Sequence, residues 1–141
     1  PGLNPSRISG SLSGKKELSL GNLTPTRDLT FVKDTAKGFY EIAMAKQLEG
    51  EATNIGMNKE TSIDRLVKLI AEIIGTDYSI VSEEYRIRPL KSEVERLLCD
   101  NTKILKNSNW KPDYDLKKGL IETIDWMKIN MNYYKPEIYN V

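Results

Sequence analysis

The chain has 141 residues, 39% hydrophobic and 29% charged, a composition typical of one globular domain and not of a disordered or fibrous chain. Its 21 basic and 20 acidic residues leave a net charge of +1, which excludes recruitment of nucleic acid or an anionic membrane by a global positive field. With no histidine and a single cysteine, the chain lacks the commonest metal ligand and cannot form an internal disulfide.

The single cysteine, Cys99, lies among Leu97, Leu98 and Asp100, so we expect a buried and unreactive core thiol. The sequence contains no apolar stretch long enough to span a bilayer, and the first residues lack the apolar segment of a signal peptide. These features predict a cytoplasmic protein with no membrane or nucleic-acid partner.

The first third of the chain predicts short strands followed by a helix. Residues 1–16, rich in Ser, Gly and Pro, are expected to be irregular, and the polar–apolar alternation of residues 17–20 predicts a strand. Residues 29–32 are predicted to be extended, with Asp34 capping a helix over residues 35–48. The predicted buried stripe of that helix is Ala36, Phe39, Tyr40, Ala43 and Leu48.

The second predicted helix has the clearest boundaries in the chain. Thr61 is placed to cap it, with Asp64 three residues on, and Gly75 closes it. Brief strands are expected before it, over residues 52–55, and after it, over residues 78–81. Its predicted buried face is Ile63, Leu66, Val67, Ile70, Ile73 and Ile74.

The last third predicts two further helices. Asp100 is expected to cap a short one, and Asp115 a long one. Trp110 and Trp126 are predicted to be core or helix-docking residues, and residues 133–141 a loose tail. The apolar positions of the two helices are Ile104 and Leu105 in the first and Leu116, Leu120, Ile124 and Met127 in the second.

This order of elements predicts an α+β fold: a small, mostly helical domain with short strands over residues 17–132. A dinucleotide-binding Rossmann half is absent, because the sequence has neither a long β-α-β series nor the Gly-x-Gly-x-x-Gly fingerprint.

Arg27 opens the first of two motifs that carry chemistry. It precedes Asp28, an apolar run and Val32-Lys33-Asp34. A guanidinium binds phosphate or carboxylate through two parallel hydrogen bonds, and one such charge-assisted contact contributes about 1.5–3 kcal/mol. The alternative is a surface arginine paired with its neighbour Asp28.

The second motif is the run from Arg88 to Leu97, Arg-Pro-Leu-Lys-Ser-Glu-Val-Glu-Arg-Leu. Proline fixes the backbone after Arg88 and disfavours helix before it, so Arg88 is expected on an extended segment or turn facing a cleft. Glu93 is a candidate acceptor for ribose hydroxyls. The alternative for Glu93 is an acid in the first turn of a helix, favoured there by the helix dipole.

The two motifs together, over residues 17–130, resemble the substrate half of the extended short-chain dehydrogenase/reductases that act on nucleotide-sugars. The longer Ser-Glu-Val form of the second motif looks most like the NAD-dependent UDP-N-acetylglucosamine 4,6-dehydratases. The resemblance implies that Arg27, Arg88 and Glu93 bind the nucleotide diphosphate and ribose of a UDP-sugar.

In the intact enzyme, the resemblance implies transfer of the sugar C4 hydride to NAD, loss of water across C5 and C6, and return of the hydride at C6. The catalytic and cofactor-binding residues would then lie in the missing Rossmann domain, so this chain alone is expected to bind no cofactor and to be inactive. Tyr114 and Lys118 match the family's Tyr-x-x-x-Lys pair, but Tyr114 precedes the predicted cap and is not expected to be catalytic.

Three other interpretations stay open. The first is a nucleotide-sugar 4-epimerase, since both reactions need the same grip on the nucleotide. The second is a free-standing nucleotide-binding or interaction module without catalysis. The third is a part that folds by forming a homo-oligomer, because loss of a partner half exposes an interface. The motifs do not define the base or the sugar.

Overall fold

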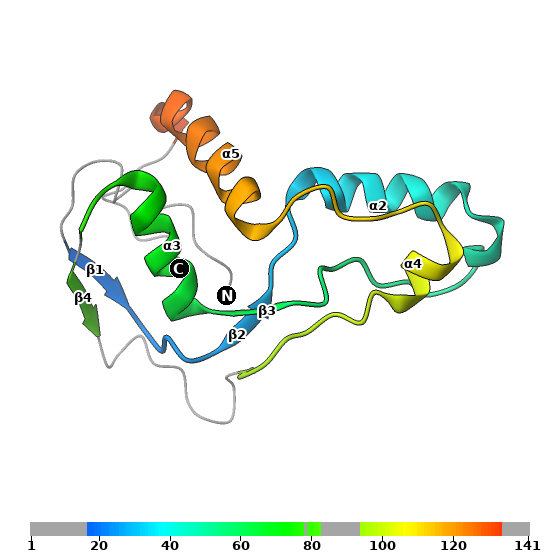
Figure 1. Cartoon of the computed structure of the whole chain (residues 1–141), viewed down its shortest axis with the longest axis horizontal. Coiled ribbons are helices and arrows are strands. Elements are labelled where there is room, and N and C mark those ends of the chain that lie inside the picture. The colour runs from blue at the N-terminus through cyan, green and yellow to red at the C-terminus, as the bar shows by residue number, and fades with distance from the viewer. Residues whose placement is uncertain (1–16, 78, 83–93, 134–141) are drawn as a thin grey trace. The chain divides into compact units, whose positions relative to one another are not determined.

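The computed structural model of the chain describes residues 17–77, 79–82 and 94–133 (Figure 1). They divide into two compact units. Unit 1 comprises residues 1–23, 64–93 and 120–141, and unit 2 comprises residues 24–63 and 94–119, each as far as they are described. The predicted mixture of helices and short strands is confirmed, whereas the predicted irregular start and all but the first residue of the tail lie outside the described residues.

Unit 1 contains a pair of parallel strands. β1 (Glu17–Leu20) pairs with β4 (Ser79–Ser82), with Glu17 opposite Ser79 and Leu20 opposite Ser82. The first strand lies where the alternation predicted it, and the second is shifted by one residue. Parallel strands need a long crossover connection, and the connection here includes α3 (Ile63–Ile74), which directly precedes β4 within this unit.

The apolar core of unit 1 is aliphatic. Four side chains of α3 are buried, and their spacing places them on one side of the helix. β1 and α5 (Leu116–Ile129) contribute three more buried side chains. Gly75 has φ +73° and its N–H donates to the Ala71 carbonyl at 2.9 Å, so it closes α3 as predicted. The buried side chains are Leu20, Leu66, Val67, Leu69, Ile70, Ile124 and Met127.

Helix α5 begins at the cap that the sequence predicted, but its tryptophan does not lie where the sequence predicted it. Asp115 Oδ1 accepts a hydrogen bond from the Lys118 N–H at 2.8 Å. Trp126, predicted to be a core or helix-docking residue, is 53% exposed and is not part of the core. Successive helical residues are about 100° apart, so burying Ile124 and Met127 turns the two positions between them towards solvent. A short 3₁₀ helix, η3 (Met131–Tyr133), follows α5.

Unit 2 is organised around one short central strand. β2 (Thr26–Asp28) pairs antiparallel with β3 (Glu60–Ser62), with Arg27 opposite Thr61. On its other edge, Thr26 forms a parallel bridge with Arg96. No strand forms over residues 29–32 or 52–55, because the pairing partners lie at 26–28 and 60–62 instead, although the extended backbone predicted before the helix is present at Phe31. Thr61, predicted as a helix cap, therefore lies in β3, and α3 follows this strand directly.

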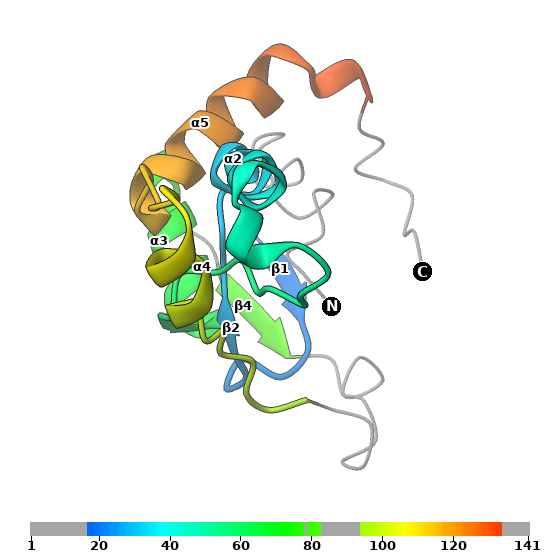
Figure 2. The same cartoon turned by 90° about the vertical axis from the view of Figure 1, so that its right-hand side faces the viewer.

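The helices of unit 2 are α2 (Val32–Met44), the 3₁₀ helix η1 (Lys46–Leu48) and α4 (Thr102–Asn107). Figure 2 looks nearly along α2, with η1 and α4 beneath it. The predicted single helix over 35–48 thus starts three residues earlier and divides at Ala45. The cap position of α4 is Asn101, one residue after the predicted cap Asp100. Asp100 still bonds to the start of the helix, because its Oδ1 accepts from the Thr102 N–H at 2.9 Å.

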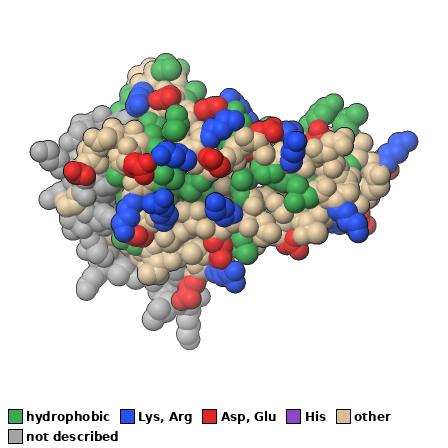
Figure 3. Space-filling model, in the orientation of Figure 1, with side chains coloured by type: hydrophobic (Ala, Val, Ile, Leu, Met, Phe, Trp, Pro, Cys, Tyr) green, Lys and Arg blue, Asp and Glu red, His purple; other side chains and the backbone are tan. Residues whose placement is uncertain are grey.

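The predicted buried stripe of α2 lies on the outer side of the helix, which corrects that prediction. Phe39 and Tyr40 are 67% and 63% exposed, and Figure 3 shows hydrophobic side chains standing out over α2 at the upper right. The two buried residues of α2 are Asp34 and Gly38. A Cβ at Gly38 would lie 2.8 Å from the Ile55 side chain, so the helix lies against that loop at a position where only glycine fits.

Apart from the buried Pro25 before β2, unit 2 buries polar side chains beside apolar ones. The apolar ones come from η1, α4 and the loop before α5, and the polar ones from β2, α2 and the start of α4. Asn101, for example, donates to the Gly56 carbonyl at 2.8 Å. The buried set is Leu48, Ile104, Trp110, Arg27, Asp34 and Asn101.

Candidate functional site

Arg27 lies in the interior of unit 2. Its residue is 7% exposed, whereas Thr26 and Asp28 on either side are half-buried. The guanidinium Nη1 donates to the Thr26 carbonyl at 2.7 Å. The alternative of a surface arginine is therefore wrong, and the guanidinium is held at a fixed place at the centre of the strand.

Asp28, the second residue of the motif, joins two loops. Its Oδ1 accepts from the Met57 N–H at 2.8 Å and its Oδ2 from the Cys99 N–H at 3.2 Å. Gly56 makes this possible, because a Cβ there would lie 2.3 Å from the Cys99 Cβ. The Asp28 carboxylate therefore positions backbone, as a carboxylate accepting two amides does.

Asp34 also positions the backbone of other segments of unit 2, and it is not the helix cap that the sequence suggested. Its residue is 1% exposed, and its two oxygens accept from the N–H groups of Asp113 (2.9 Å) and Tyr114 (3.1 Å). Its own carbonyl accepts from the Trp110 Nε1–H at 2.9 Å. The cap position of α2 is Phe31, without a side-chain bond, so Asp34 lies inside the first turn and links α2 to the chain before α5.

The segment that follows the second motif is attached beside Arg27. Thr26 donates its N–H to the Glu95 carbonyl at 2.8 Å and accepts from the Leu97 N–H at 3.1 Å. The other two predicted site residues, Arg88 and Glu93, lie outside the described residues. The described chain resumes directly after Glu93, two residues before this pairing.

Glu60 and Arg96 form a two-pronged ion pair at the edge of β3. Arg96 Nε donates to Glu60 Oε1 at 2.6 Å and Arg96 Nη2 to Oε2 at 2.9 Å, while the Thr26 hydroxyl donates to Oε1 at 2.8 Å. The hydrogen bonds from Arg96 and then from Thr26 lower the pKa of Glu60. Sequence reasoning did not select this pair, because its members are 36 positions apart and nothing local links them.

Tyr114 and Lys118 meet, but not in the way that acid–base chemistry needs. Lys118 Nζ lies 4.1 Å from the centroid of the Tyr114 ring, over its face. The ring also packs on Phe31, with centroids 4.4 Å apart, and Lys33 lies 5.7 Å from the Tyr114 centroid. The lysine therefore contacts the ring as a cation–π partner, and Tyr114 precedes the Asp115 cap as expected.

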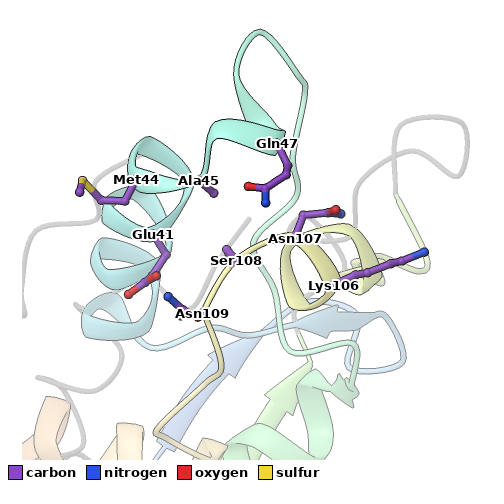
Figure 4. Close-up of a pocket in the computed structure, with 8 residues that line it drawn as sticks. All are labelled: Glu41, Met44, Ala45, Gln47, Lys106, Asn107, Ser108 and Asn109. Carbon is purple, nitrogen blue, oxygen red and sulfur yellow. The ribbon is translucent and has the colours of Figure 1, made fainter.

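A hollow of about 340 Å³ opens between the C-terminal end of α2, η1 and the C-terminal end of α4 (Figure 4). Arg27 does not line it. Its walls are mainly polar, with Glu41 and Lys106 as the charged members. The other lining residues are Met44, Ala45, Gln47, Asn107, Ser108 and Asn109.

The described residues give little support for a metal site, a reactive cysteine or a membrane-spanning helix. Among the described residues, no group of three or more Cys, Asp or Glu side chains is placed to hold a metal ion. Cys99 is half-buried, less than predicted, and burial together with Asp28 and Asp100 raises its pKa, which disfavours the reactive thiolate. No described helix has the length and apolar character needed to cross a membrane.

Comparison with known families decides the relationship. The model of a family described as GDP-mannose 4,6 dehydratase matches residues 5–123. The chain belongs to this family. It is also 33% identical to a putative UDP-glucose 4-epimerase of Methanocaldococcus jannaschii, over 87% of this chain but only 38% of the relative. The chain therefore spans less than half the length of that relative.

Two solved structures with similar folds carry ligands of the kind the motifs suggested. A dTDP-glucose 4,6-dehydratase of Bacillus anthracis in complex with NAD matches 94% of this chain and 40% of its own, with 27% identity and a TM-score of 0.77. A UDP-glucose 4-epimerase of Thermotoga maritima with UDP-glucose matches 88% of this chain and 38% of its own, with 27% identity and a TM-score of 0.74. The relatives thus include both dehydratases and epimerases.

Proposed function

We propose that this chain is the C-terminal, substrate-binding part of an NAD-dependent nucleotide-sugar 4,6-dehydratase. Arg27, Arg88 and Glu93 bind the nucleotide diphosphate and ribose, with UDP-N-acetylglucosamine as the preferred type of substrate. The observation that carries the proposal is the fixed, interior position of Arg27 on β2, with the chain that follows Arg88 and Glu93 paired to the same strand.

The position of Arg27 suits the binding of a diphosphate. The backbone around it is held in place by hydrogen bonds, since Asp28 accepts from two backbone amides, and Glu60 accepts from Arg96. A charged guanidinium in a poorly hydrated place is stabilised by a bidentate anion, and a diphosphate offers that geometry. Arg27 and Arg88 together would orient the sugar for reaction.

The cofactor does not fit the residues of this chain. NAD would supply the hydride acceptor, but the sequence has no glycine fingerprint, and the described parallel strands form only a pair. The proposal therefore places the cofactor and the catalytic residues in the part of the enzyme that the relatives have beyond this chain, and this chain alone is expected to be inactive.

A 4-epimerase is the second candidate, favoured by the 33% identity to a relative described as an epimerase. Both enzymes would use the same arginines, so binding cannot separate them. Product analysis on the intact enzyme does: a 4-keto-6-deoxy sugar identifies the dehydratase, and a C4 epimer of unchanged mass identifies the epimerase.

Calorimetric titration of the chain with UDP tests the binding role. Arg27→Lys keeps the positive charge but loses the two parallel hydrogen bonds of the guanidinium, and Arg88→Ala removes the second guanidinium. We expect each substitution to weaken UDP binding at least about tenfold. Arg65→Ala is the matched control, because this exposed arginine on α3 lies outside both motifs and should bind UDP as the parent does.

The melting temperature of each variant is measured as well, because Arg27→Lys tests UDP binding only if β2 stays folded. Equal UDP affinity in the parent and both variants, or no UDP binding by the parent, would contradict the assignment of these arginines to the nucleotide.

A further inference from the structure

Thr26, the residue before Arg27, joins three segments of unit 2. Its N–H donates to the Glu95 carbonyl at 2.8 Å, and its carbonyl accepts from the Leu97 N–H at 3.1 Å. Its hydroxyl donates to Glu60 Oε1 at 2.8 Å. The N–H, the carbonyl and the hydroxyl of Thr26 thus each have a partner on another segment, and these bonds together set the orientation of its peptide groups.

The Thr26 carbonyl also holds the arginine that is proposed to bind the diphosphate. Arg27 Nη1 donates to this carbonyl at 2.7 Å, the same oxygen that accepts from Leu97. A carbonyl oxygen has two lone pairs, so it can accept both bonds. A guanidinium has five N–H donors in one rigid plane, so the direction of one bond orients the others. A turn of the Thr26 peptide would therefore turn the guanidinium of Arg27.

Glu60 and Arg96 close a ring around Thr26. The backbone of Arg96 forms a parallel bridge with Thr26, and its side chain bonds to both oxygens of Glu60, at 2.6 and 2.9 Å. Glu60 Oε1 also accepts from the Thr26 hydroxyl. Thr26 is thus held by the backbone of one member of the pair and by the carboxylate of the other.

The ion pair itself is open to water. The side chain of Arg96 is 67% exposed and that of Glu60 is 28% exposed. Such a pair adds little to stability, because water screens it and two long side chains lose conformational freedom. Its two parallel bonds nevertheless have defined directions. The arrangement therefore suits positioning better than stabilisation.

We infer that Glu60 and Arg96 are positioning residues for Arg27. As a two-pronged pair they hold the Thr26 peptide, and through its carbonyl they keep the Arg27 guanidinium in the orientation that binds the diphosphate of the nucleotide-sugar. Neither member of the pair contacts the nucleotide. The inference rests on the proposed function, and it adds two residues to which the motifs assign no role.

The sign of the change in UDP affinity on Glu60→Gln separates positioning from direct electrostatics. Removing a negative charge near an anion site, or releasing Arg96 to bind the anion itself, would strengthen UDP binding. Loss of the two-pronged pair misorients Arg27, so we expect UDP to bind about fivefold more weakly by calorimetry, with the melting temperature little changed. Glu51→Gln is the matched control: it breaks another exposed ion pair of unit 2, to Lys103, and should leave UDP affinity as in the parent.

A double-mutant cycle tests whether the two residues act as one device. Arg96→Lys keeps the charge but loses the two parallel bonds, and should also weaken UDP binding about fivefold. The double variant, Glu60→Gln with Arg96→Lys, should bind UDP as weakly as either single variant, because the first substitution has already removed the pair. Affinity losses that multiply in the double variant would contradict the shared role.

Nuclear magnetic resonance of the Arg27 Nε–H group gives a readout that needs no nucleotide. Its signal is assigned with Arg27→Lys, and we expect its order parameter to fall in Glu60→Gln and to stay unchanged in Glu51→Gln. A parent chain that binds no UDP would contradict the proposed function and the inference with it. UDP binding that Arg27→Lys weakens but Glu60→Gln leaves unchanged or strengthens would overturn the inference alone, as would an unchanged order parameter of Arg27 in Glu60→Gln.

Discussion

Unit 1 and unit 2 are stabilised in different ways. Among the described residues, the buried side chains of unit 1 are all aliphatic or methionine, whereas unit 2 also buries three polar side chains that make specific hydrogen bonds. In unit 1, burial of apolar area supplies the stability and tolerates small shifts. In unit 2, Asp28 and Asp34 each accept two backbone N–H groups from distant segments, which fixes how these segments lie within the unit.

The proposed function gives this difference a physical reason. A site that orients a diphosphate needs side chains held within a fraction of an ångström, and hydrogen bonds with defined directions provide this better than apolar contacts. Unit 2 also directs its largest apolar stripe outward, as a region does when it completes its core with another body.

Removing the Asp34 carboxylate should have the largest effect. Asp34→Ala removes a buried carboxylate and leaves the N–H groups of Asp113 and Tyr114 without this acceptor, and we expect the free energy of unfolding to fall by about 4 kcal/mol. Denaturant unfolding at neutral pH measures it. A loss under about 1 kcal/mol would show that unit 2 does not depend on this carboxylate.

An apolar truncation in unit 1 should come next. Leu66→Ala removes a fully buried side chain of α3 and should lower the free energy of unfolding by about 3 kcal/mol. Hydrogen exchange should accelerate in α3 while the α4 peptide, residues 102–107, is unaffected. Equal acceleration in both helices would show that the two units unfold as one, and would weaken the comparison.

A surface cap gives the matched control for the first substitution. Asp115→Ala removes the same carboxylate, but its one described amide bond, to Lys118, is exposed, so we expect a loss of about 1 kcal/mol. If this loss equals that of Asp34→Ala, burial of the carboxylate is not what separates the two sites.

The smallest effect is expected for Glu60→Gln. Arg96 and Thr26 lower the pKa of Glu60 below its reference value of 4.5, so the carboxylate stabilises the folded chain above that pH. The stabilisation is lost as the pH falls through the lowered pKa. The melting temperature of the variant should therefore lie slightly below that of the parent at pH 7 and meet it in acid, and added salt should narrow the gap. A gap that widens in acid would contradict the sign.

Local patterns predicted unit 1 better than unit 2. The spacing of apolar residues identified α3 and the part of α5 that lies in unit 1, and Gly75 ended α3 as expected, because each signal acts within one or two turns. The failures in unit 2 have a different origin. Asp34 bonds to residues 79 and 80 positions away, and the pairing of β2 joins segments 36 apart, which no local pattern reveals.

The stripe of α2 shows the limit most clearly. Helical periodicity establishes that apolar side chains share one face, but it does not say whether the protein that covers the face belongs to this chain. The candidate site has the same character. The motifs selected Arg27 and its interior position fits the role, whereas the roles of Arg88 and Glu93 stay predictions.

The measurement that most directly tests the central claim is the mass of the natural polypeptide that contains this sequence. An antibody raised against the chain would isolate that polypeptide from its own cells for intact mass spectrometry. The account predicts a mass well above 16.1 kDa, since the chain spans only 38% of its M. jannaschii relative. A natural mass near 16.1 kDa would contradict it, because the polypeptide would then have no cofactor-binding half.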